Sequence, residues 1–116
     1  MLAAEAGRLS PGVIDLAHLE QQTGGDLELE QELLALFADQ CVRMLKLIRE
    51  ARPQEGCDAA HTLKGAARAV GAWSVAAAAE KVEQSLRRGR VAEGLGELAL
   101  AADEARATIA ARLPAA

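Results

Sequence analysis

The sequence of 116 residues contains almost no aromatic side chains: Phe37 and Trp73 are the only two, and tyrosine is absent. Prolines number only three, whereas alanine, with 27 residues, is the commonest amino acid. β-Sandwiches and barrels draw on aromatic and β-branched residues, so this composition argues against both folds. Alanine has the highest helix propensity and the smallest side chain of the good helix formers. The composition therefore predicts helices that pack closely through small side chains.

The chain also has no basic excess, no long apolar run and no cysteine framework. Its net charge of −4 at pH 7 counts against general nucleic-acid binding, which requires a basic surface. No run approaches the roughly 18 apolar residues of a membrane span, and the N-terminus lacks the apolar core of a signal peptide. Cys41 and Cys57 form no CxxC pair, which is typical of reduced thiols. We therefore expect a cytoplasmic protein that contacts neither nucleic acid nor a membrane.

Glycine, proline and capping residues divide the chain into a leader and one domain. Residues 1–12 are expected to form a flexible N-terminal leader, and residues 13–113 a single helical domain. The expected helices are a short one at 13–21 and four longer ones at about 27–51, 54–70, 74–88 and 94–112. Because the connections are short, the predicted fold is all-α: an antiparallel up-and-down four-helix bundle with a short additional N-terminal helix. We expect Asp26 to cap the first long helix and Gly71 to end the second.

Apolar residues recur at spacings of three and four in each long segment, the pattern of a helix with one buried face. In the first long segment the predicted core residues are Leu29, Leu33, Phe37, Cys41, Met44 and Ile48. In the second they are Ala60, Leu63, Ala67 and Val70. In the third and fourth they are Val75, Ala79, Val82 and Leu86, then Leu95, Leu98, Ala102, Ala105 and Ile109. The short N-terminal helix is expected to add Ile14, Leu16 and Leu19 to this core.

Four residues of the second long segment share a face that core packing does not explain. With Ala60 at 0° and about 100° per residue, the core residues fall between about 280° and 360°. The other side of the helix holds His61 at about 100°, Lys64 at about 40°, Gly65 at about 140° and Arg68 at about 80°. Gly65 is informative, because a glycine inside a helix costs about 1 kcal/mol relative to alanine. We infer that another molecule needs the space that the missing methyl group leaves.

The same face carries the groups that phosphoryl chemistry requires. Neutral imidazole is a nucleophile near pH 7, because histidine has a reference pKa of about 6.5. Lys64 and Arg68 would hold an anion beside the ring of His61, lysine as a mobile point charge and arginine as a planar fork. A nucleophile, two cations and the clearance at Gly65 together indicate phosphoryl transfer to His61.

The run His61-Thr62-Leu63-Lys64-Gly65-Ala66-Ala67, with Gly71-Ala72 following, resembles the motif of the histidine-containing phosphotransfer (HPt) domain of two-component phosphorelays. That motif reads His-x-Leu-Lys-Gly, with small residues after it and a later glycine. The resemblance includes the opening helices and, in the helix after the motif, Val75, Ala79, Val82 and Glu83. It covers roughly residues 13–110, nearly the whole chain.

The resemblance implies a phosphoryl carrier that works only together with partner domains. His61 would accept a phosphoryl group at Nε2 from the phospho-aspartate of a receiver domain and relay it to another receiver. Lys64 would neutralise the phosphoryl oxygens, and Gly65 would leave room for the docking receiver. Glu83 would accept a hydrogen bond from Nδ1 of His61 and fix its tautomer, and Arg68 is retained as a supporting cation.

Partners and cofactors follow from the same resemblance. The partners would be response-regulator receiver domains and a (hybrid) sensor histidine kinase, and Mg²⁺ would belong to the receiver. We expect no metal site, no intrinsic cofactor and no independent enzyme activity, because the chain carries no ATP-binding kinase module. We expect a monomer, since the predicted helices complete one bundle. Met1 and the C-terminal tail favour a freestanding protein over a domain of a hybrid kinase.

Other classes of protein remain as alternatives. An HPt-like bundle can bind a receiver or kinase without carrying a phosphoryl group, although the intact His61 and Lys64 argue against this. The Ala-x3-Gly spacing at residues 67–71 loosely fits a helix-turn-helix, but the helix that follows offers acidic residues rather than a basic face. Cys57 lies one turn before His61, but two ligands alone do not make a zinc site.

Three further charged features receive structural interpretations. His18 is expected at the surface or at a helix end. The cluster of Arg87, Arg88 and Arg90 lies at a predicted helix C-terminus, where the helix dipole favours cations. We therefore assign no function to this cluster.

Overall fold

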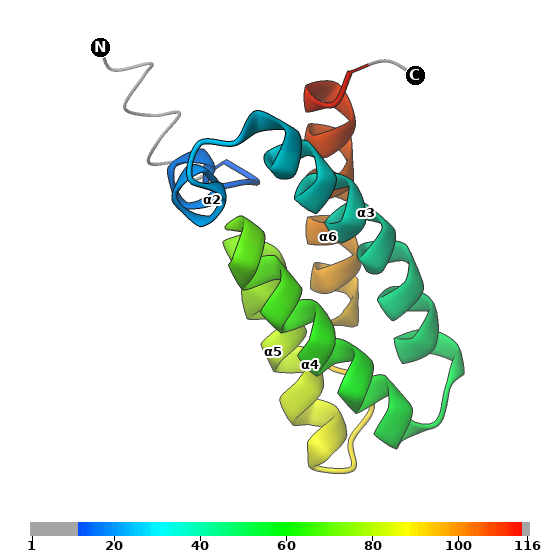
Figure 1. The fold of residues 1–116 in the computed structure, drawn as a ribbon. Helices are drawn as coiled ribbons and strands as arrows, with labels where there is room; N and C mark the ends of the chain where they lie inside the picture. Colours follow the sequence, from blue (N-terminus) through cyan, green and yellow to red (C-terminus); the bar gives the residue numbers. More distant parts are fainter. Residues whose placement is uncertain (1–11, 115–116) are drawn as a thin grey trace.

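The fold is built from α-helices throughout residues 12–114, the part of the chain that a computed structural model describes (Figure 1). These residues form α2 (Leu16–Thr23), α3 (Leu27–Glu50), α4 (Pro53–Val70), α5 (Trp73–Arg87) and α6 (Leu95–Arg112), with no strand among them. The all-α prediction is confirmed, and each helix lies close to its predicted bounds. The predicted leader, apart from Gly12, lies outside the described residues. No helix between residues 12 and 114 combines the length and apolarity that a membrane span needs.

The helix ends follow the capping residues of the sequence. Asp26 precedes α3, and its Oδ1 accepts a hydrogen bond from the backbone N–H of Leu29 at 3.0 Å, as predicted. Pro53 is the first residue of α4, where its missing N–H would have no helical partner. Gly71 follows α4 in the left-handed conformation (φ 77°), so the predicted glycine stop is confirmed.

α3, α4, α5 and α6 lie side by side, and α2 lies at one end of them, against α3 and α4 (Figure 1). α4 packs against α3 and α5, and α6 packs against the same two helices, while α4 and α6 share no contact within the described residues. α4 and α3 lie close together at Gly56, where an added Cβ would be in van der Waals contact with the Cα atom of Ile48 at 3.5 Å. α4 is thus held between two helices, and its remaining flank, which includes His61, is exposed.

The buried face of α3 differs from the predicted one. Leu29 is 38% exposed, and Leu33 and Met44 are only partly buried. The residues of α3 that lie in the core are Leu34, Phe37, Cys41, Leu45 and Ile48. The prediction was wrong for Leu29, whereas Leu33 and Met44 pack against the edge of the core. Both the predicted and the observed sets have spacings of three and four, so the pattern alone does not choose between them.

A contact with α6 explains which flank of α3 is covered. Glu30 lies one turn before Leu34 and is itself buried. Its Oε1 accepts hydrogen bonds from Nε and Nη2 of Arg112, the last residue of α6, at 2.9 and 2.8 Å. Since a buried carboxylate requires a partner, this ion pair fixes α6 over the flank of Glu30 and Leu34. Leu29 is left outside.

The other predicted core stripes are largely confirmed. The four predicted residues of α4 are buried, as are those of α5 and α6 except Leu86 and Leu95, which are partly buried. Ile14 and Leu19 are buried too, but Leu16 is 44% exposed and its predicted core position was wrong. The reason is that α2 lies across the end of the helices and contacts them with one face only.

Polar contacts attach α2 to the turn between α4 and α5. The backbone N–H of Asp15 donates to the carbonyl of Gly71 at 2.9 Å, and Trp73 Nε1 donates to Asp15 Oδ2 at 3.0 Å. His18 Nε2 lies 2.8 Å from the carbonyl oxygen of Arg68, and a carbonyl can only accept, so the imidazole is the donor. His18 lies near a helix end, as predicted, and it also has a structural role, because it holds α2 against the end of α4.

Candidate functional site

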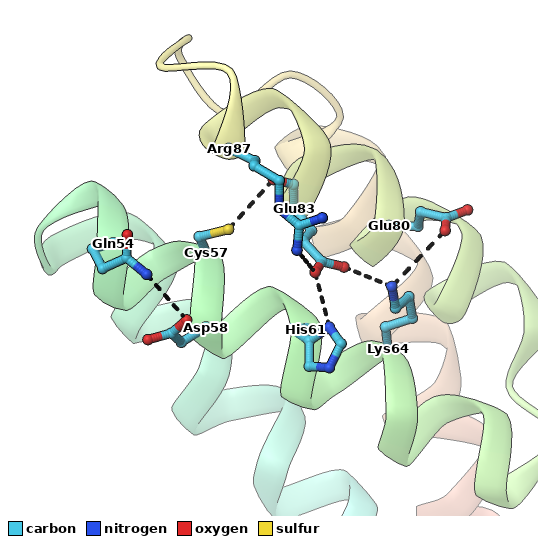
Figure 2. Close-up of polar contacts among 8 residues, drawn as sticks. All are labelled: Gln54, Cys57, Asp58, His61, Lys64, Glu80, Glu83 and Arg87. Atoms are coloured by element: carbon cyan, nitrogen blue, oxygen red, sulfur yellow. Dashed lines mark hydrogen bonds and ion pairs between the residues drawn. The ribbon is translucent and has the colours of Figure 1, made fainter.

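His61 lies in the middle of α4, on the flank beside α5 (Figure 2). Its side chain is 67% exposed. Nδ1 is 2.8 Å from Oε2 of Glu83, a residue of α5. Nε2 makes no hydrogen bond within the described residues. One ring nitrogen is thus held by the protein, and the other is open to an incoming molecule.

Glu83 is a buried carboxylate, and its ionisation fixes the tautomer of His61. Only 2% of its surface is exposed. Burial raises the pKa of Glu83, but hydrogen bonds and charge contacts with Lys64 and His61 outweigh burial and hold the pKa below its ordinary value. An ionised carboxylate can only accept hydrogen bonds, so Nδ1 of His61 must be the donor. In the neutral imidazole the proton is therefore on Nδ1, and the lone pair is on Nε2.

Lys64 is directed toward α5 and away from solvent. Its Nζ lies 2.7 Å from Oε1 of Glu83 and 3.9 Å from Oε1 of Glu80, and its side chain is only 14% exposed. Lys64 lies on the predicted face, and it is only 14% exposed because α5 covers the edge of that face nearest to the core. The 2.7 Å contact pairs the ammonium group of Lys64 with the buried oxygen Oε1 of Glu83.

Arg87 and Cys57 also contact Glu83, although neither was predicted as a site residue. Arg87, one turn later in α5, donates from Nη2 to Oε2 of Glu83 at 2.7 Å. The spacing of four residues between Glu83 and Arg87 was the available signal, since side chains at this spacing meet on a helix surface. Cys57 is buried, and its thiol donates to the backbone carbonyl of Glu83 at 3.5 Å.

Gly65 and Arg68 lie on the same helix but outside this cluster. A Cβ added at Gly65 would meet no atom within 4 Å, so nothing in the described residues requires glycine there. The side chain of Arg68 is exposed and forms no ion pair within residues 12–114. The structure therefore brings together His61, Lys64 and Glu83 of the predicted site, places open space at Gly65, and leaves Arg68 apart.

The arrangement suits nucleophilic attack by an imidazole on an anionic group. Nε2 carries the lone pair, and Lys64 and Arg87 supply positive charge around the carboxylate that orients the ring. Among residues 12–114, no cluster of three or more His, Cys, Asp or Glu side chains is placed to bind a metal ion. The open Nε2 is the atom of this cluster at which a group could be accepted.

Comparison with known proteins agrees with this chemistry. The family model for the Hpt domain matches residues 28–113. The chain belongs to the Hpt domain family. A solved relative, the histidine phosphotransferase ShpA from Caulobacter crescentus, is 35% identical over 87% of this chain and 90% of that chain, with a TM-score of 0.69. No curated protein sequence matches the chain.

Membership of the Hpt family establishes the general function of this chain. It is a histidine phosphotransfer protein of a two-component phosphorelay. Proteins of the family carry phosphoryl groups rather than act as independent catalysts, and they work with receiver domains and histidine kinases. The predicted family and function are therefore confirmed at this level.

The lowered pKa of Glu83 predicts a specific pH dependence of stability. A group whose pKa is lower in the folded state stabilises the protein above its ordinary value of 4.5, and this contribution is lost as pH falls through the folded-state value. We expect Glu83→Gln to lower the free energy of unfolding by about 2 kcal/mol at pH 7, because charged hydrogen bonds to Lys64 and Arg87 are lost. The difference from wild type should shrink below pH 4.5.

Urea unfolding from pH 7 to pH 3 measures this difference. Glu104→Gln is the matched control, because Glu104 is exposed on α6 and forms no ion pair within the described residues. It should unfold like wild type at every pH. A Glu83→Gln difference that stayed constant across the whole range would contradict the assignment of an ionised, cation-bound Glu83.

Proposed function

We propose that His61 is the phospho-accepting residue of this Hpt domain. It takes the phosphoryl group from the phospho-aspartate of a receiver domain and relays it to the aspartate of another receiver. The observation that supports this most directly is the 2.8 Å contact between Nδ1 of His61 and the buried carboxylate of Glu83. That contact keeps the proton on Nδ1 and directs an unprotonated Nε2 outward from an exposed side chain.

The transfer step uses few protein groups. The lone pair of Nε2 forms a bond to phosphorus while the bond between phosphorus and the aspartyl oxygen breaks. The electron pair of that bond returns to the aspartate carboxylate, and the Nδ1 proton stays hydrogen-bonded to Glu83. Such a reaction depends on positioning and on charge stabilisation more than on covalent chemistry by the protein. The divalent ion, Mg²⁺, belongs to the receiver, so the domain needs no cofactor of its own.

The neighbouring residues of α4 take supporting roles. Lys64 neutralises the phosphoryl oxygens, which requires its ammonium group to turn from Glu83 toward His61. Gly65 lies one turn after His61, and the open space at its Cβ position lets the receiver approach the helix backbone. Arg68 adds a positive charge at the edge of the same flank, where its exposed side chain can attract an anionic partner.

We extend the same proposal to the arrangement of the helices, the partners and the cellular compartment. The four long helices form an antiparallel up-and-down bundle, which is supported by the cyclic order of their contacts and their short connections. The partners are receiver domains and a (hybrid) sensor histidine kinase, and the domain acts as a monomer. The cytoplasm is the compartment, which is supported by two free, buried thiols, Cys41 and Cys57.

Phosphoryl transfer from a panel of phosphorylated receiver domains with Mg²⁺ tests the proposal. The label should move to this chain, should be stable in alkali and labile in acid, as a phosphoramidate is, and should map to the peptide that contains His61. Label on another residue would refute the assignment of His61. Binding to receivers without any transfer would favour a module that binds partners without carrying a phosphoryl group.

A further inference from the structure

Arg87 is a second cation on the carboxylate that orients His61 (Figure 2). Its Nη2 is 2.7 Å from Oε2 of Glu83, and the same oxygen lies 2.8 Å from Nδ1 of His61. Lys64 contacts the other oxygen, Oε1, at 2.7 Å. Glu83 is only 2% exposed. Each oxygen of one buried carboxylate therefore has its own cation.

Phosphorylation of His61 would remove one of these two cations. We build here on the phosphotransfer function proposed above. A phosphoryl group on Nε2 adds negative charge beside the ring, and Lys64 can neutralise it only by turning away from Oε1. Lys64 can make this exchange because its ammonium group is a point charge on a flexible stem and needs no fixed geometry at Oε1. Yet a buried charge that loses its partner is strongly destabilised, so Glu83 needs a second cation at that moment.

We propose that Arg87 is a positioning residue that keeps Glu83 ionised and in place while Lys64 turns to the phosphoryl group. Its guanidinium stays charged throughout the pH range of a folded protein. It binds Oε2, the oxygen that also accepts from His61, so the exchange at Oε1 leaves the orientation of the ring unchanged. The side chain of Arg87 is 66% exposed and reaches Glu83 across one turn of α5.

No other group near Glu83 can replace Arg87. From α4, the groups that face Glu83 are His61, Lys64 and the Cys57 thiol, which binds only the backbone carbonyl. From α5 itself, Glu80 shares Lys64 and adds negative charge. Within the described residues, α6 supplies neither an ion pair nor a hydrogen bond to Glu83. Without Arg87, the departure of Lys64 would leave Glu83 without a cation, and the carboxylate would take up a proton at a higher pH.

The test measures phosphorylation of His61 by phosphoramidate, a small donor that needs no docking surface. In this reaction Nε2 bonds to phosphorus, the P–N bond breaks and ammonia leaves. We expect Arg87→Met to react several-fold more slowly than wild type, with a larger loss at pH 6 than at pH 8, because a buried carboxylate without its remaining cation takes up a proton more readily as pH falls. Arg87→Gln, which removes the charge but can still donate, should show the same pH-dependent loss, whereas Arg87→Lys should restore most of the rate.

Arg88→Met is the matched control. Arg88 is the next residue, is exposed, and forms no ion pair in the described part of the chain. It carries the same charge, and its loss should leave the rate unchanged at both pH values. Equal rates for wild type, Arg87→Met and Arg87→Gln would overturn the proposal. A defect seen only with a receiver as donor, as a higher KM, would also overturn it and make Arg87 a docking residue. If neither phosphoramidate nor any receiver labels His61 of the wild type, the proposed function itself fails.

Discussion

Replacement of His61 by glutamine is expected to abolish phosphoryl transfer to this chain, by a factor of about 10⁴ or more, because the nucleophile is lost. Glutamine removes the nucleophile with the least structural change, since its amide N–H can still donate to Glu83 in place of Nδ1. The side chain is 67% exposed, so we expect the stability to change by no more than about 0.5 kcal/mol. Transfer from a phosphorylated receiver and urea unfolding measure the two quantities.

The matched control for this substitution is His18→Gln. His18 is the only other histidine of the chain, and its Nε2 contacts the Arg68 carbonyl rather than the cluster around Glu83. It should accept label at the wild-type rate. Calorimetric titration with the fastest receiver should give the same affinity for His61→Gln as for wild type. Continued labelling of His61→Gln would show that another residue carries the phosphoryl group.

Enlarging the side chain at Gly65 is expected to separate stability from function. Because a Cβ at this position meets no atom within 4 Å, Gly65→Ala should stabilise the helix by about 0.5 to 1 kcal/mol. Gly65→Leu should gain a similar amount but slow transfer from a receiver about 100-fold, since displacing the reacting groups by an ångström has an effect of this size. The rise in stability excludes misfolding as the reason for the slower transfer.

Gly96→Leu provides the matched control for Gly65→Leu. Gly96 is also a helical glycine with nothing within 4 Å of an added Cβ, and it lies in α6, which has no contact with α4 in the described residues. Its substitution should leave transfer unchanged. Phosphorylation by phosphoramidate should be much less affected by Gly65→Leu than transfer from a receiver. Wild-type transfer by Gly65→Leu would contradict the inference that glycine makes room for a partner.

The reactive face of α4 was predictable because its signal is local. The glycine inside a helix, the histidine one turn before it and the cations at helical spacing are all read from one segment of sequence. The same holds for the cap at Asp26 and the stop at Gly71, which depend on the chemistry of single residues and their immediate neighbours. Glu83 was identified through its place in the family pattern, and the structure puts its carboxylate 2.8 Å from Nδ1 of His61.

The positions of Lys64 and Arg87 could not be predicted in the same way. A helical wheel places Lys64 on the edge of an open sector, but α5 lies against that edge and Glu83 binds the ammonium group. Arg87 was interpreted as part of a cationic cluster at a helix end. Arg87 contacts the same carboxylate as His61 only because α5 packs against α4 with Glu83 beside His61.

The helical class, the helix ends and the reactive flank of this Hpt domain could be predicted from local sequence, because helix propensity, capping and periodicity act within a few residues. Tertiary structure decided which flank of α3 is buried, where Leu34 and Leu45 replace Leu29 and Met44. It also decided that three cationic or donor groups meet on one buried carboxylate. Both outcomes depend on how each helix is rotated against its neighbours, and spacing within a single helix does not specify that rotation.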